Sequence, residues 1–109
     1  MMSNWTAEDD KLVTLAKSVR SRIGAASGAA VRDETGRTYA NAEVSTGFLN
    51  LSAIELTVGQ AIASGANSLE AVVLCTEEEL ADYDRAVVEG FAGSHTPIYL
   101  VNVRGERTN

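Results

Sequence analysis

The sequence predicts an α/β fold, a three-layer α-β-α sandwich built on a mixed sheet. Three observations support this prediction: amphipathic helical segments alternate with short β-branched runs, a tight turn at residues 33–36 separates two strand-like segments, and residues 71–75 form an unbroken apolar run. Such a run is typical of a strand that is covered on both faces. We therefore expect an antiparallel N-terminal hairpin followed by parallel β-α-β units with right-handed crossovers.

Residues 4–23 predict the first helix. Thr6 and Asp9 make a capping-box-like start, and apolar residues then recur at helical spacing. Acidic residues near the amino end and arginines near the carboxyl end suit the helix dipole, and we interpret these charges as a solvated face. Strands are expected at residues 27–32 and 38–42, followed by a loop at residues 43–48.

Residues 50–65 predict a central buried helix. Its apolar positions are Leu51, Ile54, Val58, Ala61, Ile62 and Gly65. A second layer or a second subunit could approach closely at its small residues, which are Ala53, Gly59, Ala61 and Ala63. These positions make the helix a candidate core and interface element.

A third helix is expected to begin at Thr76, because a hydroxyl followed by three glutamates is a strong helix start signal. Its apolar positions are Leu80, Tyr83, Val87 and Phe91. Gly90 or Gly93 would end it. Residues 98–103 predict the last buried strand, and the final six residues are expected to fray.

Composition restricts the function classes. A chain of 109 residues that is 45% hydrophobic predicts one domain, residues 1–109. A net charge of −6 without a lysine or arginine cluster argues against nucleic acid or a membrane surface as partner. The single cysteine, Cys75, excludes an internal disulfide, and neither a leader nor a spanning apolar run is present, so we expect a cytoplasmic protein.

Four stretches resemble cytidine deaminases in element order and in local sequence. They are GAAVRDETGRTYANAEV at residues 28–44, SAIELTVGQAIASG at 52–65, AVVLC at 71–75 and RAVVEGFAGSHTPIYLVN at 85–102. The resemblance implies the cytidine deaminase-like fold, with a mixed sheet between helix layers. It also implies assembly around the central helices, so we expect a homo-oligomer, either a dimer or a tetramer.

The resemblance does not extend to the family's zinc site. Such enzymes use His or Cys followed by Ala-Glu at the start of the central helix, and Pro-Cys-x-x-Cys at the start of the next helix. The first ligand and the catalytic acid fall on Ser52 and Ile54, and the two cysteines fall on Ala81 and Asp84. The resemblance therefore implies no catalytic residue, no zinc and no other cofactor. Glu55 lies one residue from Ile54, but one helical step turns a side chain by about 100° and advances it by about 1.5 Å, so it is a poor substitute for the catalytic acid.

The family's ribose-binding Asn-x-Glu-Asn phrase is altered as well. It corresponds to residues 43–46, where Glu43, Ser45 and Thr46 occupy the substrate-binding positions.

Three further residues were considered as functional candidates. Cys75 ends an apolar strand and is interpreted as an inert core thiol, and His95 as a loop residue. A zinc site assembled from Asp84, His95 and Cys75 would lack the close ligand pair typical of such sites. Trp5 either fixes the amino terminus to the domain or covers a surface between subunits.

Three functions are compatible with these observations. The preferred hypothesis is a catalytically degenerate cytidine deaminase-like protein that serves as a non-enzymatic binding or assembly module. The second is a zinc-dependent cytidine or nucleoside deaminase with atypical ligands, and the third is a metal-free nucleoside sensor.

Overall fold

A computed structural model describes residues 5–109 and shows three helices and six strands within that range. In chain order the elements are α1 (Ala7–Ile23), β1 (Gly28–Asp33), β2 (Thr38–Ala42), β3 (Val44–Ser45), β4 (Asn50–Leu51), α2 (Ala53–Ala63), β5 (Leu69–Cys75), α3 (Asp82–Ala92) and β6 (Ile98–Val101). None of the helices in residues 5–109 is long and apolar enough to span a membrane.

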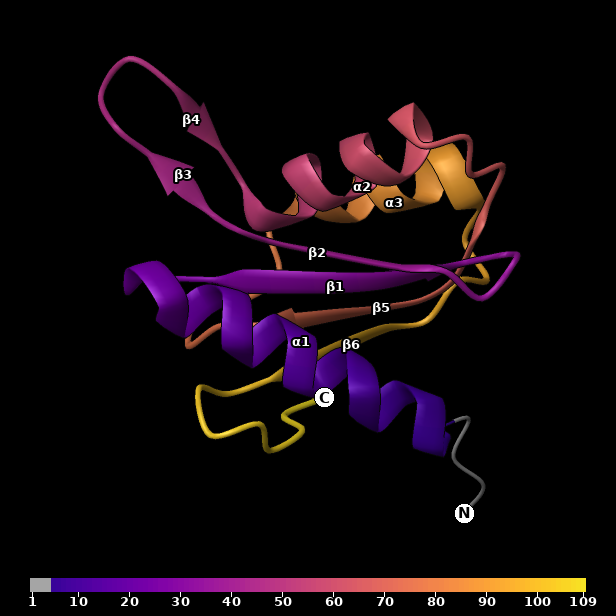
Figure 1. Cartoon of the computed structure of the whole chain (residues 1–109), viewed down its shortest axis with the longest axis horizontal. Helices are drawn as coiled ribbons and strands as arrows, with labels where there is room; N and C mark the ends of the chain where they lie inside the picture. Colours follow the sequence, from indigo (N-terminus) through magenta and orange to yellow (C-terminus); the bar gives the residue numbers. More distant parts are fainter. Residues whose placement is uncertain (1–4) are drawn as a thin grey trace.

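The main sheet has the strand order β2-β1-β5-β6. β1 is antiparallel to both β2 and β5, whereas β5 and β6 are parallel and are joined through α3. Helix α1 covers one face of the sheet, and α2 and α3 cover the other (Figure 1). The predicted α/β class, the N-terminal hairpin and one parallel unit, β5-α3-β6, are confirmed. The unit β2-α2-β5 differs from the prediction, because β5 pairs with the antiparallel β1 and not with β2.

The core consists of two apolar clusters, one on each face of the sheet. Alternation along the strands divides the side chains between them: Val31 and Val72 face α2 and α3, whereas Ala30 and Val73 face α1. Residues 28–31 of β1 and 71–75 of β5 are buried, and their sequences are continuously apolar or small, as expected for central strands that are covered on both faces.

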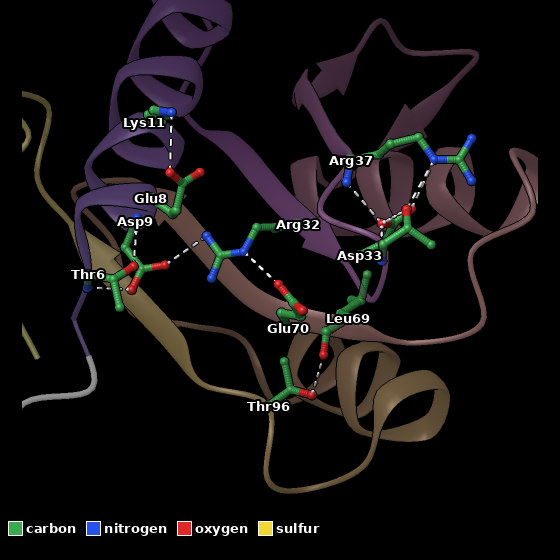
Figure 2. A network of polar contacts seen from close by, with 11 residues as sticks. Thr6, Glu8, Asp9, Lys11, Arg32, Asp33, Arg37, Leu69, Glu70 and Thr96 are labelled. Carbon is green, nitrogen blue, oxygen red and sulfur yellow. Dashed lines mark hydrogen bonds and ion pairs between the residues drawn. The ribbon is translucent and has the colours of Figure 1, made fainter.

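The amino end of α1 carries a buried ion pair. Thr6 and Asp9 form the predicted capping box, but the Asp9 side chain is buried and lies 3.0 Å from the Arg32 guanidinium, which also pairs with Glu70 at 2.8 Å (Figure 2). The interpretation of these charges as a solvated face is therefore wrong for Asp9. Its carboxylate connects α1 to β1, and through Arg32 to β5.

Helix α3 begins six residues later than predicted. Its N-cap is Ala81, which makes no side-chain capping bond. The Thr76 hydroxyl accepts from the Glu78 N–H and contacts the Ser27 hydroxyl, so it closes a local turn instead of capping a helix. Residues 76–81 consequently form a loop between β5 and α3.

Two other segments are more ordered than predicted. Residues 43–48 were expected to be a loop, but β3 pairs with β4 in a second, small hairpin that projects away from the main sheet (Figure 1). The final six residues were expected to fray, yet Arg107 bridges to Val101 and the Thr108 N–H donates to the Leu100 carbonyl at 2.9 Å. This segment covers the outer edge of β6.

Trp5, the first residue that the structure describes, packs onto the domain. Its ring packs edge-on against Tyr99, with the ring centroids 4.8 Å apart, and its Nε1–H donates to Asp10 at 2.8 Å. The Arg107 guanidinium lies over both rings, at 5.7 Å from Trp5 and 4.7 Å from Tyr99. The first of the two predicted roles of Trp5 is thus observed.

Candidate functional site

A cavity of about 330 Å³ opens where the β3–β4 hairpin, the start of α2 and the start of α3 converge. Its volume lies at the lower end of the range of small-molecule sites. The residues that line it are Ser27, Glu43, Val44, Ser45, Asn50, Leu51, Ser52, Ala53, Glu55, Leu74, Thr76, Glu78, Glu79, Ala81 and Asp84.

The amino end of α2 forms one wall. Ser52 is the N-cap, and its Oγ accepts from the Glu55 N–H at 3.0 Å while the Glu55 carboxylate accepts from the Ser52 N–H at 2.8 Å. This reciprocal pair is a capping box, which the Ser-x-x-Glu spacing encodes. The Glu55 side chain also accepts a hydrogen bond from Tyr83, and this bond is the main cause of the raised pKa of the Tyr83 phenol.

The Ser52 hydroxyl also joins the two helices. It donates to Asp84 Oδ1 at 2.7 Å, which links the N-cap of α2 to the first turn of α3. The hydroxyl therefore makes two hydrogen bonds inside the protein, one as acceptor and one as donor. Asp84 and Ser52 are 32 residues apart in the sequence, so this contact depends on the fold.

The floor of the cavity is a pair of buried hydroxyls. Ser27 precedes β1 and Thr76 follows β5, and their Oγ atoms lie 3.2 Å apart. The antiparallel register pairs Gly28 with Cys75 and so brings the two hydroxyls together. Neither residue was predicted to belong to a site, because Ser27 was expected to begin a strand and Thr76 to begin a helix; the register places both at the same end of the sheet.

The cavity is acidic. Five carboxylates line it, and no lysine, arginine or histidine does; the acids are Glu43, Glu55, Glu78, Glu79 and Asp84. The cavity therefore presents negative potential and hydroxyl groups to any ligand, which favours neutral or cationic groups over phosphates.

Five of the seven positions selected in the sequence analysis meet at this cavity. They are Glu43, Ser45, Ser52, Ala81 and Asp84. The other two do not: Ile54 is fully buried in the apolar core, and Thr46 hydrogen-bonds to Leu49 within the exposed hairpin turn.

The alternative metal ligands are not brought together. His95 lies in an exposed turn after α3, and the Cys75 Sγ contacts the Asn102 carbonyl at 3.4 Å in the cluster on the α1 face. Burial raises the pKa of the Cys75 thiol, as expected for an inert core residue. Within residues 5–109, no group of three or more His, Cys, Asp and Glu side chains is placed to hold a metal ion.

A family model described as cytidine deaminase-like matches residues 5–105. The chain belongs to the cytidine deaminase-like family. No curated protein sequence matches it.

Solved structures of cytidine deaminases share the fold of this cytidine deaminase-like chain. The enzyme from Burkholderia pseudomallei is 18% identical, with a TM-score of 0.76, 98% of this chain covered and 91% of the other. The enzyme from Mycobacterium tuberculosis is 21% identical, with a TM-score of 0.67 and coverage of 88% and 85%. The enzyme from Mycobacterium leprae is 20% identical, with a TM-score of 0.65 and coverage of 95% and 92%.

Three residues of this cavity occupy positions at which the resemblance places zinc ligands. Such a site needs three protein ligands drawn from thiolate, imidazole and carboxylate groups. Ser52, Ala81 and Asp84 offer a hydroxyl, a methyl group and one carboxylate, and the carboxylate already accepts from the hydroxyl. These three positions by themselves therefore do not supply the three ligands of the family's zinc site.

Proposed function

We propose that this cytidine deaminase-like protein is catalytically degenerate and acts as a non-enzymatic binding or assembly module. The 2.7 Å hydrogen bond between Ser52 and Asp84 supports this proposal most directly. It joins two positions at which the resemblance places zinc ligands, and it uses the polar groups of both. Ile54, at the position of the catalytic acid, is buried in hydrocarbon and provides no proton-transfer group.

Metal analysis and a cytidine-to-uridine assay test the catalytic part of the proposal. We expect the purified protein to hold no stoichiometric zinc and to produce no uridine. About one zinc per chain together with turnover would overturn the proposal in favour of a deaminase with atypical ligands.

A ligand-restoring variant provides the positive control. Ser52→Cys, Ala81→Cys and Asp84→Cys together place three thiols around the cavity, and we expect this variant to bind about one zinc per chain. A matched variant that carries only Ser52→Cys and Asp84→Cys keeps the methyl group of Ala81, so it offers two ligands at these positions and is expected to bind zinc far more weakly. If both variants bind zinc equally, these positions are not the family's ligand positions.

A second candidate function, a metal-free nucleoside sensor, is favoured by the polar cavity of about 330 Å³. Calorimetry with cytidine and uridine tests it. Saturable binding that is weakened by Ser45→Ala, which removes a hydroxyl from the cavity wall, would support the sensor. Heats equal to those of dilution for both nucleosides would exclude it for these ligands.

The assembly part of the proposal is a homo-oligomer, but the surface anticipated from small residues needs revision. Ala53 and Ala61 lie in the chain's own core, at 2% and 0% exposure, so they are not available to a second subunit. Gly59 and Ala63 are exposed on α2. Ile62, expected to be buried, is 49% exposed because it projects from the outer side of the same helix.

A further inference from the structure

The two edges of the main sheet differ in how they are covered. Next to β6, the C-terminal segment supplies hydrogen-bond partners: the Thr108 N–H donates to the Leu100 carbonyl, and the Asn109 side chain bonds to the Leu100 N–H at 2.8 Å and the Ile98 carbonyl at 2.9 Å. Next to β2, no strand pairs with the outer side among the residues that the structure describes. The β2 edge is thus the bare edge.

The register identifies which backbone groups of β2 face outward. Asp33 donates to the Arg37 carbonyl, and Glu43 donates to the Ser27 carbonyl, so the odd-numbered residues of this segment bond to β1. By alternation, the N–H and C=O groups of Thr38, Ala40 and Ala42 point away from β1.

The β2 edge lacks the features that usually prevent strand pairing. Its sequence, TYANA, contains no proline and no charged residue, and its pairing with β1 shows no bulge. An uncharged strand edge with this free ladder is a template for pairing with another chain.

An apolar stripe on α1 runs beside this edge. Leu15, Val19 and Ile23 recur every four residues, and Ile23 is 65% exposed. Val19 and Ile23 line a cavity of about 230 Å³ together with Ala40 and Ala42. At the other end of β2, Leu15 lines a second hollow together with Thr38.

We propose that a second copy of this chain docks on the β2 edge, antiparallel, about a two-fold axis at Ala40. The sequence around that residue is self-complementary: Thr38 lies opposite Ala42 of the other copy, and Arg37 lies opposite Glu43. All three outward-facing residues then find ladder partners, and the two sheets become one continuous sheet.

The α1 stripe has the same centre as the β2 edge. Val19 lines the cavity at Ala40, and Leu15 and Ile23 lie four residues to either side of it. Leu15 to Ile23 spans about 12 Å along the helix, close to the roughly 13 Å from Thr38 to Ala42 along the strand. The same two-fold therefore places Leu15 of one copy opposite Ile23 of the other.

Arg37 and Glu43 can pair only between two copies of the chain. Arg37 and Glu43 are six residues apart on an extended segment, about 20 Å, so they cannot pair within one chain. Between copies they occupy a non-hydrogen-bonded pair, in which side chains approach most closely. Each interface contains this pair twice.

Docking of two copies on the β2 edge would supply the surface and the partner for the assembly part of the proposed function, and the proposal of this docking rests on that proposed function. Light scattering at high micromolar concentration should give the wild type at least twice the 11.5 kDa chain mass. Ala40→Cys should form an intermolecular disulfide under mild oxidation, because the two copies of residue 40 face each other across the axis. Thr38→Cys is the matched control, since its two copies lie about 13 Å apart, beyond disulfide reach.

Ala40→Pro removes only an outward N–H and should give a folded monomer by circular dichroism and light scattering. Glu43→Arg should weaken assembly, because it places two arginines opposite each other at each end of the interface, and Glu43→Gln should weaken it less. Arg37 is left unchanged in these variants, because its guanidinium also lies 3.7 Å from the buried Asp33 carboxylate. A wild-type monomer, or equal crosslinking at residues 38 and 40, would overturn the proposal. A dimer with no crosslink at residue 40 would place assembly on another surface and would leave the proposed loss of catalysis unaffected.

Discussion

Gly28 should be one of the least replaceable residues in the chain, because β1 and α1 are in close contact there. A Cβ atom added at this position would lie 2.3 Å from the Ala16 carbonyl oxygen, 2.9 Å from Arg20 Cβ and 3.0 Å from Arg20 N. Two of these three atoms belong to the α1 backbone, so relief requires α1 to shift as a body. Overpacking of this kind costs about 1–3 kcal/mol, and the lower chain entropy of alanine in the unfolded state offsets about 0.4–1 kcal/mol of it.

Gly59→Ala is the matched control for Gly28→Ala. Gly59 is an exposed glycine inside α2, and an added Cβ would meet no atom within 4 Å. Alanine should therefore stabilise the helix by about 0.5–1 kcal/mol. Urea unfolding followed by circular dichroism measures both changes as shifts of the midpoint. If Gly28→Ala leaves the midpoint unchanged or raises it, the close packing of β1 on α1 is not as described.

Three further predictions concern single side chains. Ser52→Ala removes the N-cap of α2 and the Asp84 contact, so it should lower the free energy of unfolding by about 1 kcal/mol. Ser52→Thr keeps a hydroxyl and should retain most of the wild-type free energy of unfolding. Equal urea midpoints for Ser52→Ala and the wild type would argue against the capping box. Hydrogen bonds from Thr35, Tyr39 and the Arg37 N–H, opposed by burial, lower the pKa of the Asp33 carboxyl from 3.8 to about 2. Because the pKa of Asp33 is lower in the folded than in the unfolded protein, the ionised carboxylate stabilises the fold above pH 4, and this stabilisation is lost as the pH falls towards 2. Asp33→Asn should therefore lose less stability than the wild type over this pH range. Identical acid unfolding transitions for the two proteins would refute the prediction. Cys75 should resist a thiol reagent at pH 8 in the native protein and react after unfolding, since burial raises its pKa; fast native labelling would show an accessible thiolate.

The sheet was predictable because its signals are local. Residues 71–75 are apolar without interruption, and a strand that is buried on both faces needs that composition. The turn at residues 33–36 set the hairpin, and the Asp33 carboxylate holds it through the Thr35 and Arg37 N–H groups. The alternation of helices and strands then left few possible topologies.

The start of α3 was not predictable from local signals. Thr76 and the glutamates after it match a helix N-terminus, but the Thr76 hydroxyl is engaged by Ser27 from the neighbouring strand. This partner is 49 residues away, and no local pattern reports it. Tertiary contacts thus override the capping propensity and leave the first turn of α3 without a side-chain cap.

The candidate site was predictable in part. Glu43, Ser52 and Asp84 were located through the resemblance, and they do meet at one cavity. Glu78 and Glu79 were assigned to a helix, and they reach the cavity because residues 76–81 form a loop instead. An error in one element boundary therefore hid part of the site.

The acidity of the cavity has a structural cause. The amino ends of α2 and α3 both point at it, and each helix carries a carboxylate at its third position, Glu55 in α2 and Asp84 in α3. Negative charge at these positions stabilises the helix ends. At least two of the five carboxylates therefore serve the fold whether or not a ligand binds.

The Ser52–Asp84 hydrogen bond is a polar link between the amino ends of α2 and α3. A hydrogen bond to a charged group contributes only about 1.5–3 kcal/mol. The Ser52–Asp84 bond therefore cannot hold α2 against α3 by itself. The contact depends on the apolar cluster beneath it, where Ile54, Val58 and Val88 are buried at 0%, 1% and 0% exposure. Ile54 thus supports the helix pair through the apolar surface that it buries.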